Sequence, residues 1–526
     1  MTASQLHQGS TYIDMILQGL RRWPERDAIV DAGGLALTYA NLEQRIWKFA
    51  QALKDAGLNP GDGLAQLAAN RVDTYVLMAA CLASGIRYTP LHPMGSLGDQ
   101  LYIINDANIS LVVVDVPFFA DRGRELRSSI ESRISVFALG DADFGADIIA
   151  LAEACSPNIL DYQPCCDDIA WLTYTGGTTG KPKGVILTQG AMAAKSLISL
   201  GEWQWPEEIR YLASSPISHA AGFLLIPTFL NGGKVYLLGG FDPDKVLDLV
   251  ENEGINTLFL VPTMIYALLD HARTQTANLS SIESIIYASA PMSPTRLREA
   301  LELFGPVLMQ CYGQTECVHL TMMRKEEHTL NHPHRLSSCG RPPAGIIMSL
   351  LDSAGEPVPQ GEVGEVCVRG AAVMRGYWNK PEETAETLRG DWLHTGDLAY
   401  QDDEGFYYLV DRAKDLIISG GFNVYPKEVE DVLATHQAVA MSAVIGIPDE
   451  KWGEKVAAMV VLRPGQKVNE DDLKAELREL VKQGKGAVHS PKLIEFIEKI
   501  PVTALGKTDK KGLRAQFWGS GERQIN

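Results

Sequence analysis

The amino-acid sequence predicts an α/β protein with a large N-terminal part and a smaller C-terminal part. The chain has 526 residues, which is long enough for about two to four domains. Hydrophobic residues make up 46% and charged residues 21%, a globular composition that excludes disorder as the main state. Helical and β-strand patterns alternate along the chain, which favours helices layered over largely parallel sheets.

The N-terminal part shows this alternation most clearly. A helix is indicated by apolar residues at helical spacing, namely Leu42, Ile46, Phe49 and Leu53. Gly57 provides the stop after that helix. Residues 111–114 and 257–261 are short apolar runs that predict buried strands, and Pro262 ends the second of them. Between these strands a second helix face runs up to Gly254 and is marked by Val246, Leu249 and Val250.

The C-terminal part predicts a second α/β unit. Residues 405–410 are typical of a strand, and residues 411–415 form a charged break. After this break we expect a helix over 427–435, strands near 443–445 and 456–461, and a helix over 471–481. The break places a domain boundary near Lys414, so the expected domains are residues 1–413 and 414–526.

The charge balance disfavours polyanionic partners. Lys and Arg number 47 and Asp and Glu 65, giving a net charge of −18. Such a protein repels nucleic acids and anionic membranes on average, so an anionic ligand needs a local binding site. The first residues lack the basic and apolar regions of a signal peptide. The longest nearly uncharged apolar stretch, residues 75–86, is too short to span a bilayer.

The cysteines favour a reducing compartment. The eight cysteines include no C-x-x-C pair, which disfavours a disulfide framework or a zinc site. We therefore expect a cytoplasmic protein. The sequence leaves a homodimer open.

A loop rich in Gly, Thr and Lys carries the first chemistry. An apolar strand ends at Tyr174 and is followed by residues 175–184, which read TGGTTGKPKG. Glycines let backbone N–H groups approach phosphate oxygens, hydroxyls donate further hydrogen bonds and lysines supply charge. The Walker pattern fails, because Thr175 stands where its first glycine should be and Pro182 stands where Ser or Thr should follow the lysine. The loop therefore predicts a phosphate site of another kind.

Together with this loop, further motifs resemble the adenylate-forming (ANL) superfamily of acyl-CoA synthetases, aryl-CoA ligases, luciferases and peptide-synthetase adenylation domains. These motifs lie at residues 216–222, 288–293, 312–316, 364–370, 392–397, 411–415, 419–426 and 506–507. Their order and spacing match the superfamily from about residue 25 to about residue 515. The resemblance implies an ATP-dependent carboxylate–CoA ligase of the AMP-forming type, with ATP, Mg²⁺ and coenzyme A as cofactors and a small mobile C-terminal domain.

The resemblance also implies which residues bind the nucleotide. The triphosphate loop would be Thr175, Gly176, Gly177, Thr178, Thr179 and Gly180, with Lys183 nearby. Many relatives carry Ser at the position of Gly176, so one hydroxyl is missing. Glu316 would bind Mg²⁺, since carboxylates suit this hard cation. The rest of the nucleotide site would comprise Ser289, Ala290, Pro291, Tyr312, Gly313, Gln314, Thr315, Asp397 and Arg412. Tyr312 would stack on adenine, and Asp397 would accept hydrogen bonds from the ribose.

Catalysis would depend on Lys507, His219, Thr175 and Glu316. The resemblance makes Lys507 the lysine that stabilises negative charge during adenylation. His219 would border the acyl site and position the substrate; a general base is not needed, because a carboxylic acid is already ionised at pH 7. Lys414 would be the hinge between the two domains, and Gly420 and Gly421 would allow the thiol arm of coenzyme A to pass.

The acyl site predicted by the resemblance is formed by His219, Ala220, Phe223, Tyr287, Ala288, Cys311, Gly313 and Cys317. None of these besides His219 is of a charged type, which disfavours a second carboxylate or an amine on the substrate. A fatty, aryl or polycyclic acid is expected. Two alternatives stay open: an adenylating enzyme that loads a separate carrier protein, and a nucleotide-binding protein without catalysis.

Overall fold

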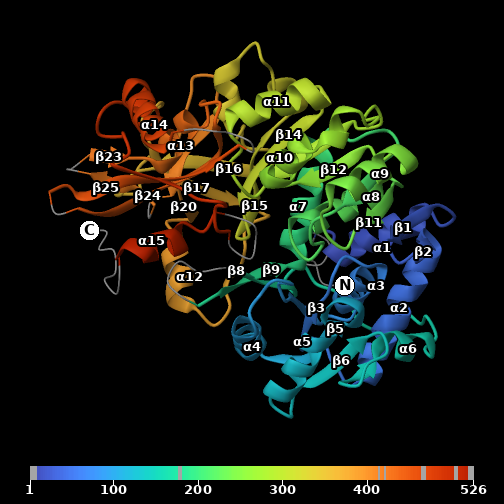
Figure 1. Ribbon diagram of the computed structural model, residues 1–526. Coiled ribbons are helices and arrows are strands. Elements are labelled where there is room, and N and C mark those ends of the chain that lie inside the picture. Colours follow the sequence, from blue (N-terminus) through green and yellow to red (C-terminus); the bar gives the residue numbers. More distant parts are fainter. Residues whose placement is uncertain are drawn as a thin grey trace.

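The structure is a computed structural model that describes residues 9–175, 181–412, 415–419, 422–449, 451–463, 469–502 and 508–518. For residues 411 and 412 only the backbone is described. The N-terminal elements α1, α2 and α3 lie at one end of the molecule, and the C-terminal elements α13, α14 and β25 lie at the other end (Figure 1).

Two eight-stranded sheets form the N-terminal part. In the first sheet the inner strands are parallel, and the described antiparallel pairs β14–β15 and β1–β2 lie at its edges. Its strands, in spatial order, are β15 (Cys317–Met323), β14 (Leu308–Gln314), β13 (Ser284–Ala288), β12 (Thr257–Leu260), β10 (Arg210–Ala213), β11 (Lys234–Leu237), β1 (Asp27–Asp31) and β2 (Ala36–Thr38). Parallel inner strands of this kind are buried on both faces.

The second sheet is also largely parallel, with antiparallel pairs at β8–β9 and β9–β18. Its strands, in spatial order, are β18 (Gly376–Tyr377), β9 (Lys183–Thr188), β8 (Ile169–Thr175), β4 (Arg87–Pro90), β3 (Gly63–Leu67), β5 (Ile109–Asp115), β6 (Ser135–Leu139) and β7 (Ala146–Asp147). Strand β18 comes from far along the chain, so it ties a later segment to the phosphate-loop hairpin.

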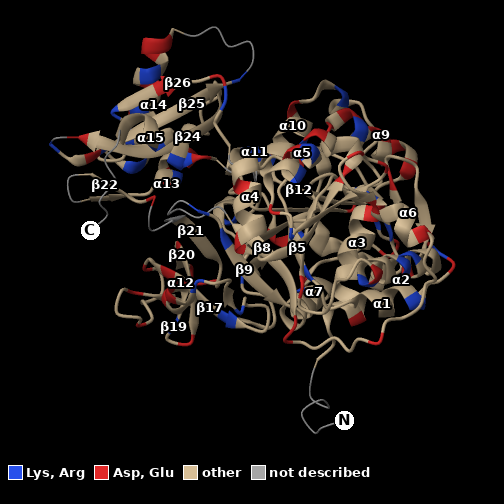
Figure 2. Cartoon of the chain, turned by 90° about the horizontal axis from the view of Figure 1, so that it is seen from below, with Lys and Arg blue, Asp and Glu red and all other residues tan. Residues whose placement is uncertain are grey.

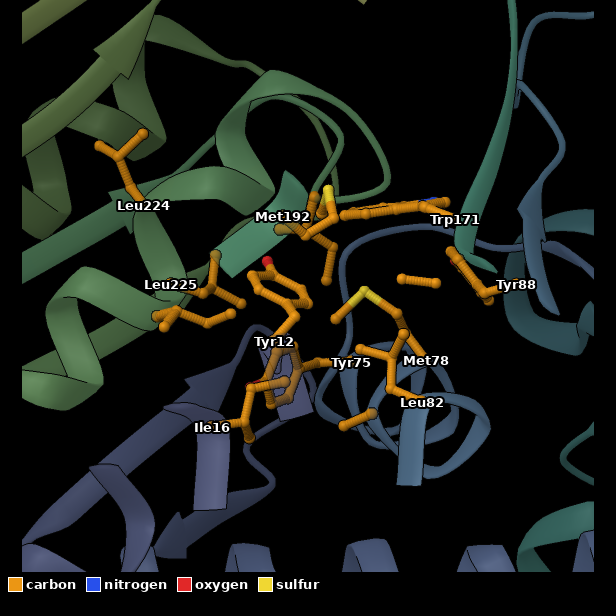
Figure 3. Packing of buried hydrophobic residues seen from close by; sticks show 14 of the residues in the cluster. Tyr12, Ile16, Tyr75, Met78, Leu82, Tyr88, Trp171, Met192, Leu224 and Leu225 are labelled. Carbon is orange, nitrogen blue, oxygen red and sulfur yellow. The ribbon is translucent and has the colours of Figure 1, made fainter. Parts of the chain in front are cut away.

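Helices fill the space between these two sheets. The shared core joins strands of both sheets to α1 (Tyr12–Arg22), α2 (Tyr39–Asp55), α3 (Val72–Ala83), α6 (Ile148–Glu153), α7 (Gln189–Glu202) and α8 (Leu225–Leu230). Figure 3 shows Tyr12, Tyr75, Met192 and Leu225 converging from four of these helices, with Trp171 of β8 beside them. Helices α9 (Pro243–Glu253), α10 (Pro262–Asp270) and α11 (Pro294–Phe304) cover the outer face of the first sheet, and α4 (Leu97–Asp106) and α5 (Val116–Ser129) that of the second.

A smaller antiparallel sheet follows. It contains β16 (Ile346–Leu351), β17 (Gly364–Gly370), β20 (Trp392–Gln401), β19 (Leu388–Arg389) and β21 (Tyr407–Arg412), and the short helix α12 (Pro381–Thr387) precedes β19. In this sheet β17 and β20 carry two of the motif segments side by side, with Cys367 opposite His394. Asp397 is the last residue of the motif at residues 392–397 and lies on β20. The sheet brings this residue towards β14 of the first large sheet.

The C-terminal part has its own sheet and core. Its strands are β23 (Phe422–Val424), β22 (Ile417–Ser419), β25 (Gly453–Leu462), β24 (Val439–Asp449) and β26 (Leu493–Phe496). Helices α13 (Pro426–Leu433) and α14 (Glu470–Lys485) pack on one face, and α15 (Lys510–Trp518) packs on the other. Covered faces on both sides of one sheet make this a separate α/β unit.

The predicted α/β class is therefore confirmed, and the elements expected from apolar spacing are present. One local expectation was wrong: the charged break begins later than residue 411, because β21 continues through Arg412 and pairs it with Asp397. Cross-strand pairing outweighs the polarity of Asp411 and Arg412 there. The boundary expected at residues 413 and 414 lies outside the described residues.

The described residues contain no helix that is long and apolar enough to cross a membrane. Figure 2 shows Lys and Arg interspersed with Asp and Glu over the labelled elements. Each of the eight cysteines carries a free thiol.

Two fully enclosed histidines make the fold sensitive to acid. Burial lowers the pKa of His319 to about 3 and that of His328 to about 4. His319 Nε2 lies 3.1 Å from Ser199 Oγ, and His328 Nε2 lies 3.0 Å from the hydroxyl of Tyr287. Both imidazoles are therefore neutral in the fold, whereas unfolded histidines take up a proton near pH 6.5.

We expect the free energy of unfolding to fall as the pH drops from about 6.5 towards 4, because the unfolded chain then binds protons that the fold excludes. The slope is about 1.4 kcal/mol per pH unit for each histidine. Urea unfolding of the wild type and of a His319→Gln/His328→Gln variant at pH 7.5 and pH 5 measures this slope. If the variant loses as much stability between the two pH values as the wild type, the assignment to these histidines is wrong.

Candidate active site

The predicted phosphate loop joins two antiparallel strands. Thr175 ends β8 and pairs with Lys183 at the start of β9. The neighbouring Tyr174 donates a hydrogen bond of 2.6 Å to Asp106, which anchors the end of the strand. The Nζ atom of Lys183 lies 5.2 Å from the ring centroid of Tyr377. Both ends of the loop are thus held by packed strands, although Gly176, Gly177, Thr178, Thr179 and Gly180 lie outside the described residues.

A second hairpin presents the predicted metal ligand. Thr315 and Glu316 form the turn between β14 and β15, where Gln314 pairs with Cys317. Glu316 is 8% exposed, and its Oε1 atom accepts a hydrogen bond of 2.8 Å from the hydroxyl of Tyr377. No other side-chain hydrogen bond reaches this carboxylate from the described residues. Tyr377 therefore orients one oxygen of the carboxylate. The other carboxylate oxygen is the kind of ligand atom that Mg²⁺ prefers.

Gly313 is needed for the close packing of this hairpin. A Cβ atom at that position would lie 1.6 Å from the carbonyl oxygen of Val318. Any other residue would therefore push the two strands apart and displace Thr315 and Glu316. The glycine in the motif has a steric role that spacing alone does not reveal.

The segments predicted to bind the nucleoside meet through hydrogen bonds between β14 and β20. The hydroxyl of Tyr312 on β14 donates to Asp397 Oδ2 on β20 at 2.6 Å. Gln314 Nε2 lies 3.5 Å from the carbonyl oxygen of Thr395 on the same strand. Burial, followed by the charge of Asp397, raises the pKa of Tyr312 well above its ordinary value. Tyr312, Gln314 and Asp397 are thus brought together from segments far apart in the sequence.

The remaining adenine-side residues follow β13. Ser289 has a φ of 75°, in the left-handed region that is uncommon for residues other than glycine. This conformation ends the strand abruptly and turns Ala290 and Pro291 out of the sheet. Strand β13 pairs in parallel with β14, so these residues lie at the same carboxyl edge as the Tyr312 segment. That edge is where open α/β sheets bind ligands.

His219 lies immediately before the 3₁₀ helix η2 (Ala220–Leu224). Its Nδ1 atom is 2.9 Å from Ser218 Oγ, and its ring centroid is 5.0 Å from that of His92. Burial and the neighbouring His92 lower the pKa of His219 to about 3. A neutral imidazole at pH 7 agrees with the expected positioning role.

The structure brings most of the predicted acyl-site residues to one core, with Tyr287 as the exception. Residues Ala220, Phe223, Ala288, Cys311 and Cys317 belong to or pack against the core between the two large sheets. Tyr287 instead points to the outer core of the first sheet, where its hydroxyl bonds to His328. Successive side chains of a strand point to opposite faces, so Tyr287 and its neighbour Ala288 cannot both face the same site.

Two residues at the site escaped the sequence analysis. Tyr377 reaches Glu316 because β18 pairs with β9, and no local pattern signals this contact. Lys195 lies in α7 with its Nζ atom 3.3 Å from the ring centroid of Phe223. A signal existed for Lys195: it is the sole charged residue between Gln189 and Gly201. A lone charge in an apolar helix indicates a buried polar contact.

The remaining predicted residues cannot be located. Lys414, Gly420, Gly421 and Lys507 lie outside the described residues, and so does the side chain of Arg412. The segment that contains Lys507 is bounded by an antiparallel bridge between Val502 and Thr508.

Comparisons with known proteins agree with this arrangement. Residues 18–378 match the AMP-binding enzyme family, and residues 428–507 match the AMP-binding enzyme C-terminal domain. The medium/long-chain-fatty-acid–CoA ligase FadD8 of Mycobacterium tuberculosis is 42% identical, covering 99% of this chain and 93% of that protein. A feruloyl-CoA synthase of Amycolatopsis is 36% identical, and the match covers 95% of this chain and 99% of that protein. The amide bond synthetase McbA from Marinactinospora thermotolerans has a TM-score of 0.88 at 34% identity, covering 96% and 100%.

The two-part α/β fold and these similarities over nearly the whole chain define an adenylate-forming enzyme. The chain belongs to the AMP-binding enzyme family. It is an acid–thiol ligase of the acyl-CoA synthetase group and uses ATP, Mg²⁺ and coenzyme A.

Proposed function

We propose that the chain activates an apolar carboxylic acid at the site around Glu316 and transfers the acyl group to coenzyme A. A carboxylate oxygen attacks the α-phosphorus of ATP, the bond to the β-phosphate breaks, and pyrophosphate leaves. The thiol sulfur of coenzyme A then attacks the acyl carbon, AMP leaves with the former carboxylate oxygen, and the thiol proton is released. Glu316 would hold the Mg²⁺ ion, which when bound would neutralise phosphate charge.

The observation that carries this proposal is the 2.6 Å hydrogen bond between Tyr312 and Asp397. It joins the adenine side of the predicted site to the ribose side, across two different sheets. In our proposal Asp397 accepts the ribose hydroxyls and Tyr312 holds its carboxylate in place while stacking on the base. A preorganised nucleoside site of this kind favours attack by positioning the α-phosphorus.

The phosphate side is supported by a second chain of contacts. Lys183 lies over the ring of Tyr377, and Tyr377 donates to Glu316. We assign the triphosphate to the loop after Thr175 and the metal ion to Glu316. In this assignment Tyr377 orients the metal ligand, a role that outer hydrogen-bond partners commonly have.

Apolar acids are favoured by the residues and by the relatives. Ala220, Phe223, Ala288, Cys311 and Cys317 are apolar or small. FadD8 is named for medium- and long-chain fatty acids and the Amycolatopsis relative for a feruloyl group. We propose the same broad class here, that is, an extended fatty or arylpropenoic acid.

Thioester formation from ATP, Mg²⁺ and coenzyme A tests the proposed activity. The panel spans short, medium and long fatty acids, benzoates, cinnamates and steroid acids, and pyrophosphate release is followed in parallel. We expect both signals with one class of apolar acid. Pyrophosphate release without thioester would shift the assignment to another acceptor, such as a carrier protein or an amine; the amine is included because McbA is an amide bond synthetase. Neither signal with any acid would contradict the proposal.

We also propose that Lys414 is the hinge between domains 1–413 and 414–526. In the described arrangement the two parts are joined by an ion pair, with Arg463 Nη2 3.2 Å from Glu299 Oε1. A partly exposed pair of this kind contributes little stability. It is therefore compatible with a C-terminal domain that changes its orientation. A homodimer and a cytoplasmic location remain proposals.

Replacing Lys414 by proline should uncouple the two half-reactions, because proline fixes φ and restricts the preceding residue. We expect one half-reaction to keep its rate and the other to become at least about tenfold slower, because the C-terminal domain can no longer move between its two orientations. ATP–pyrophosphate exchange measures adenylation, and thioester formation from preformed acyl-adenylate measures transfer. Lys414→Ala is the control and should retain both. Equal rates in the proline variant and the wild type for both steps would refute the hinge.

A further inference from the structure

Lys195 is a buried lysine to which the described residues offer no hydrogen-bond acceptor. It lies in α7 and is 3% exposed. Among the described residues none accepts a hydrogen bond from its Nζ atom. Leaving the donors of a buried lysine unpaired is costly, so natural proteins usually provide an acceptor. The absence of one in the described fold indicates that a ligand supplies it.

The surroundings of Lys195 are those of the proposed acyl site. Its Nζ atom lies 3.3 Å from the ring centroid of Phe223, which supports the charge from one side only. Cys311 and Cys317 belong to the same core that Phe223 packs against. These three neighbours are among the residues that we assign to the acyl group.

A second polar atom without a partner belongs to the same region. His319 is fully buried, and no described residue bonds to its Nδ1 atom. Burial, and then the charge of Lys195, lower the pKa of His319, so the two groups interact. Burial likewise lowers the pKa of Lys195 well below its ordinary value. An oxygen atom of a bound ligand would lower the free-energy cost of burying these two groups without a hydrogen-bond partner.

The contacts of Lys195 lead to Trp171, away from the end of β8 that carries Thr175. The ring of Phe223 lies 5.9 Å from that of Trp171. Trp171 precedes Thr175 by four residues on β8, which is about 13 Å along a strand. We assign the triphosphate to the loop after Thr175, so in this assignment the reacting carboxylate lies at that end of β8. Lys195 therefore faces a more distal part of the acyl group.

We propose that Lys195 binds an oxygen acceptor on the distal part of the acyl group, so that the substrate is an apolar acid with one oxo, hydroxyl or carboxylate oxygen far from its reacting carboxyl. This inference rests on the proposed acyl-CoA ligase function and narrows its substrate class. The expectation that disfavours a second carboxylate took no lysine at the acyl site into account, and in this proposal α7 brings one there.

Matched pairs of acids test the proposal. The pairs are cinnamate with 4-hydroxycinnamate, decanoate with 9-oxodecanoate, and decanoate with decanedioate. For at least one pair the wild type should prefer the oxygen-bearing acid by roughly tenfold or more in kcat/KM, as sites built around a hydrogen bond do. Lys195→Met should abolish that preference, lowering kcat/KM for the oxygen-bearing acid by roughly 10- to 100-fold. The unsubstituted partner should change by less than about threefold.

Two further variants separate recognition from structural damage. Lys195→Gln keeps a donor without the charge, so it should restore part of the activity with an oxo or hydroxy acid but not with the dicarboxylate. Ser196→Ala changes the next residue of α7, whose hydroxyl bonds only to Met192 among the described residues, and should leave the preference intact.

The outcomes distinguish this proposal from the proposed function. A uniform loss for all acids in Lys195→Met, or no wild-type preference in any pair, would overturn the role of Lys195 while leaving the ligase assignment intact. The wild-type comparison decides the matter even if the methionine variant does not fold. If no acid of either kind yields a thioester, the proposed function itself is wrong.

Discussion

Replacing Lys507 by alanine is expected to lower the rate of adenylate formation by roughly two to three orders of magnitude, as for the loss of a preorganised charge at a transition state. ATP binding should change little, because the loop after Thr175 and the Tyr312–Asp397 pair are untouched. ATP–pyrophosphate exchange measures the rate, and equilibrium titration with a nonhydrolysable ATP analogue measures binding.

The same variant should form thioester from preformed acyl-adenylate at nearly the wild-type rate, since Lys507 is assigned to the first step only. The matched control is Lys511→Ala, which removes an exposed lysine a few residues away on α15 and should change either rate by less than about twofold. An unchanged exchange rate in Lys507→Ala would contradict the assignment.

Replacing Glu316 by glutamine is expected to lower adenylation by about 100-fold or more, because a metal ion contributes several kcal/mol to such a transition state. The amide oxygen can still accept the 2.8 Å hydrogen bond from Tyr377, so the hairpin should keep its shape. The expected signature is a higher Mg²⁺ concentration for half-maximal rate. Initial rates measured over a series of Mg²⁺ concentrations test this directly.

Tyr377→Phe separates binding of the metal from orientation of its ligand. It removes the hydroxyl that bonds to Glu316 but leaves the carboxylate, so we expect a loss of about 10-fold, typical of an outer hydrogen-bond partner. If Glu316→Gln retains the wild-type rate and Mg²⁺ dependence, Glu316 is not the metal ligand. A larger loss in Tyr377→Phe than in Glu316→Gln would mean that the hydrogen bond, and not the charge, is what matters, because Glu316→Gln keeps that bond.

Several elements were predictable because their signals are local. The helix with Leu42, Ile46 and Phe49 on one face became α2, and the apolar run at residues 111–114 became the centre of β5. Periodic apolar positions report which face of an element is buried, whatever the element packs against. Helix α9 likewise ends before Gly254, whose φ of 61° suits a glycine.

Other features depended on long-range pairing. Asp411 and Arg412 look like a charged break, but β21 carries them because β20 offers a partner strand. Tyr287 looked like a neighbour of Ala288 in the acyl site, but the strand alternation turns it to the other face, where His328 is its partner. The amino-acid type of a residue does not by itself determine which face of a sheet will be buried.

The α/β class, the order of the main elements and the family can be predicted from the amino-acid sequence, because apolar periodicity and short motifs are properties of contiguous residues. Three contacts depend on how the folded chain packs: Tyr377 with Glu316, Tyr312 with Asp397, and Lys195 with Phe223. Each of these pairs joins segments from different parts of the chain. Their contact depends on which sheets and helices pack together, and burial then turns an ordinary lysine into one that needs an acceptor.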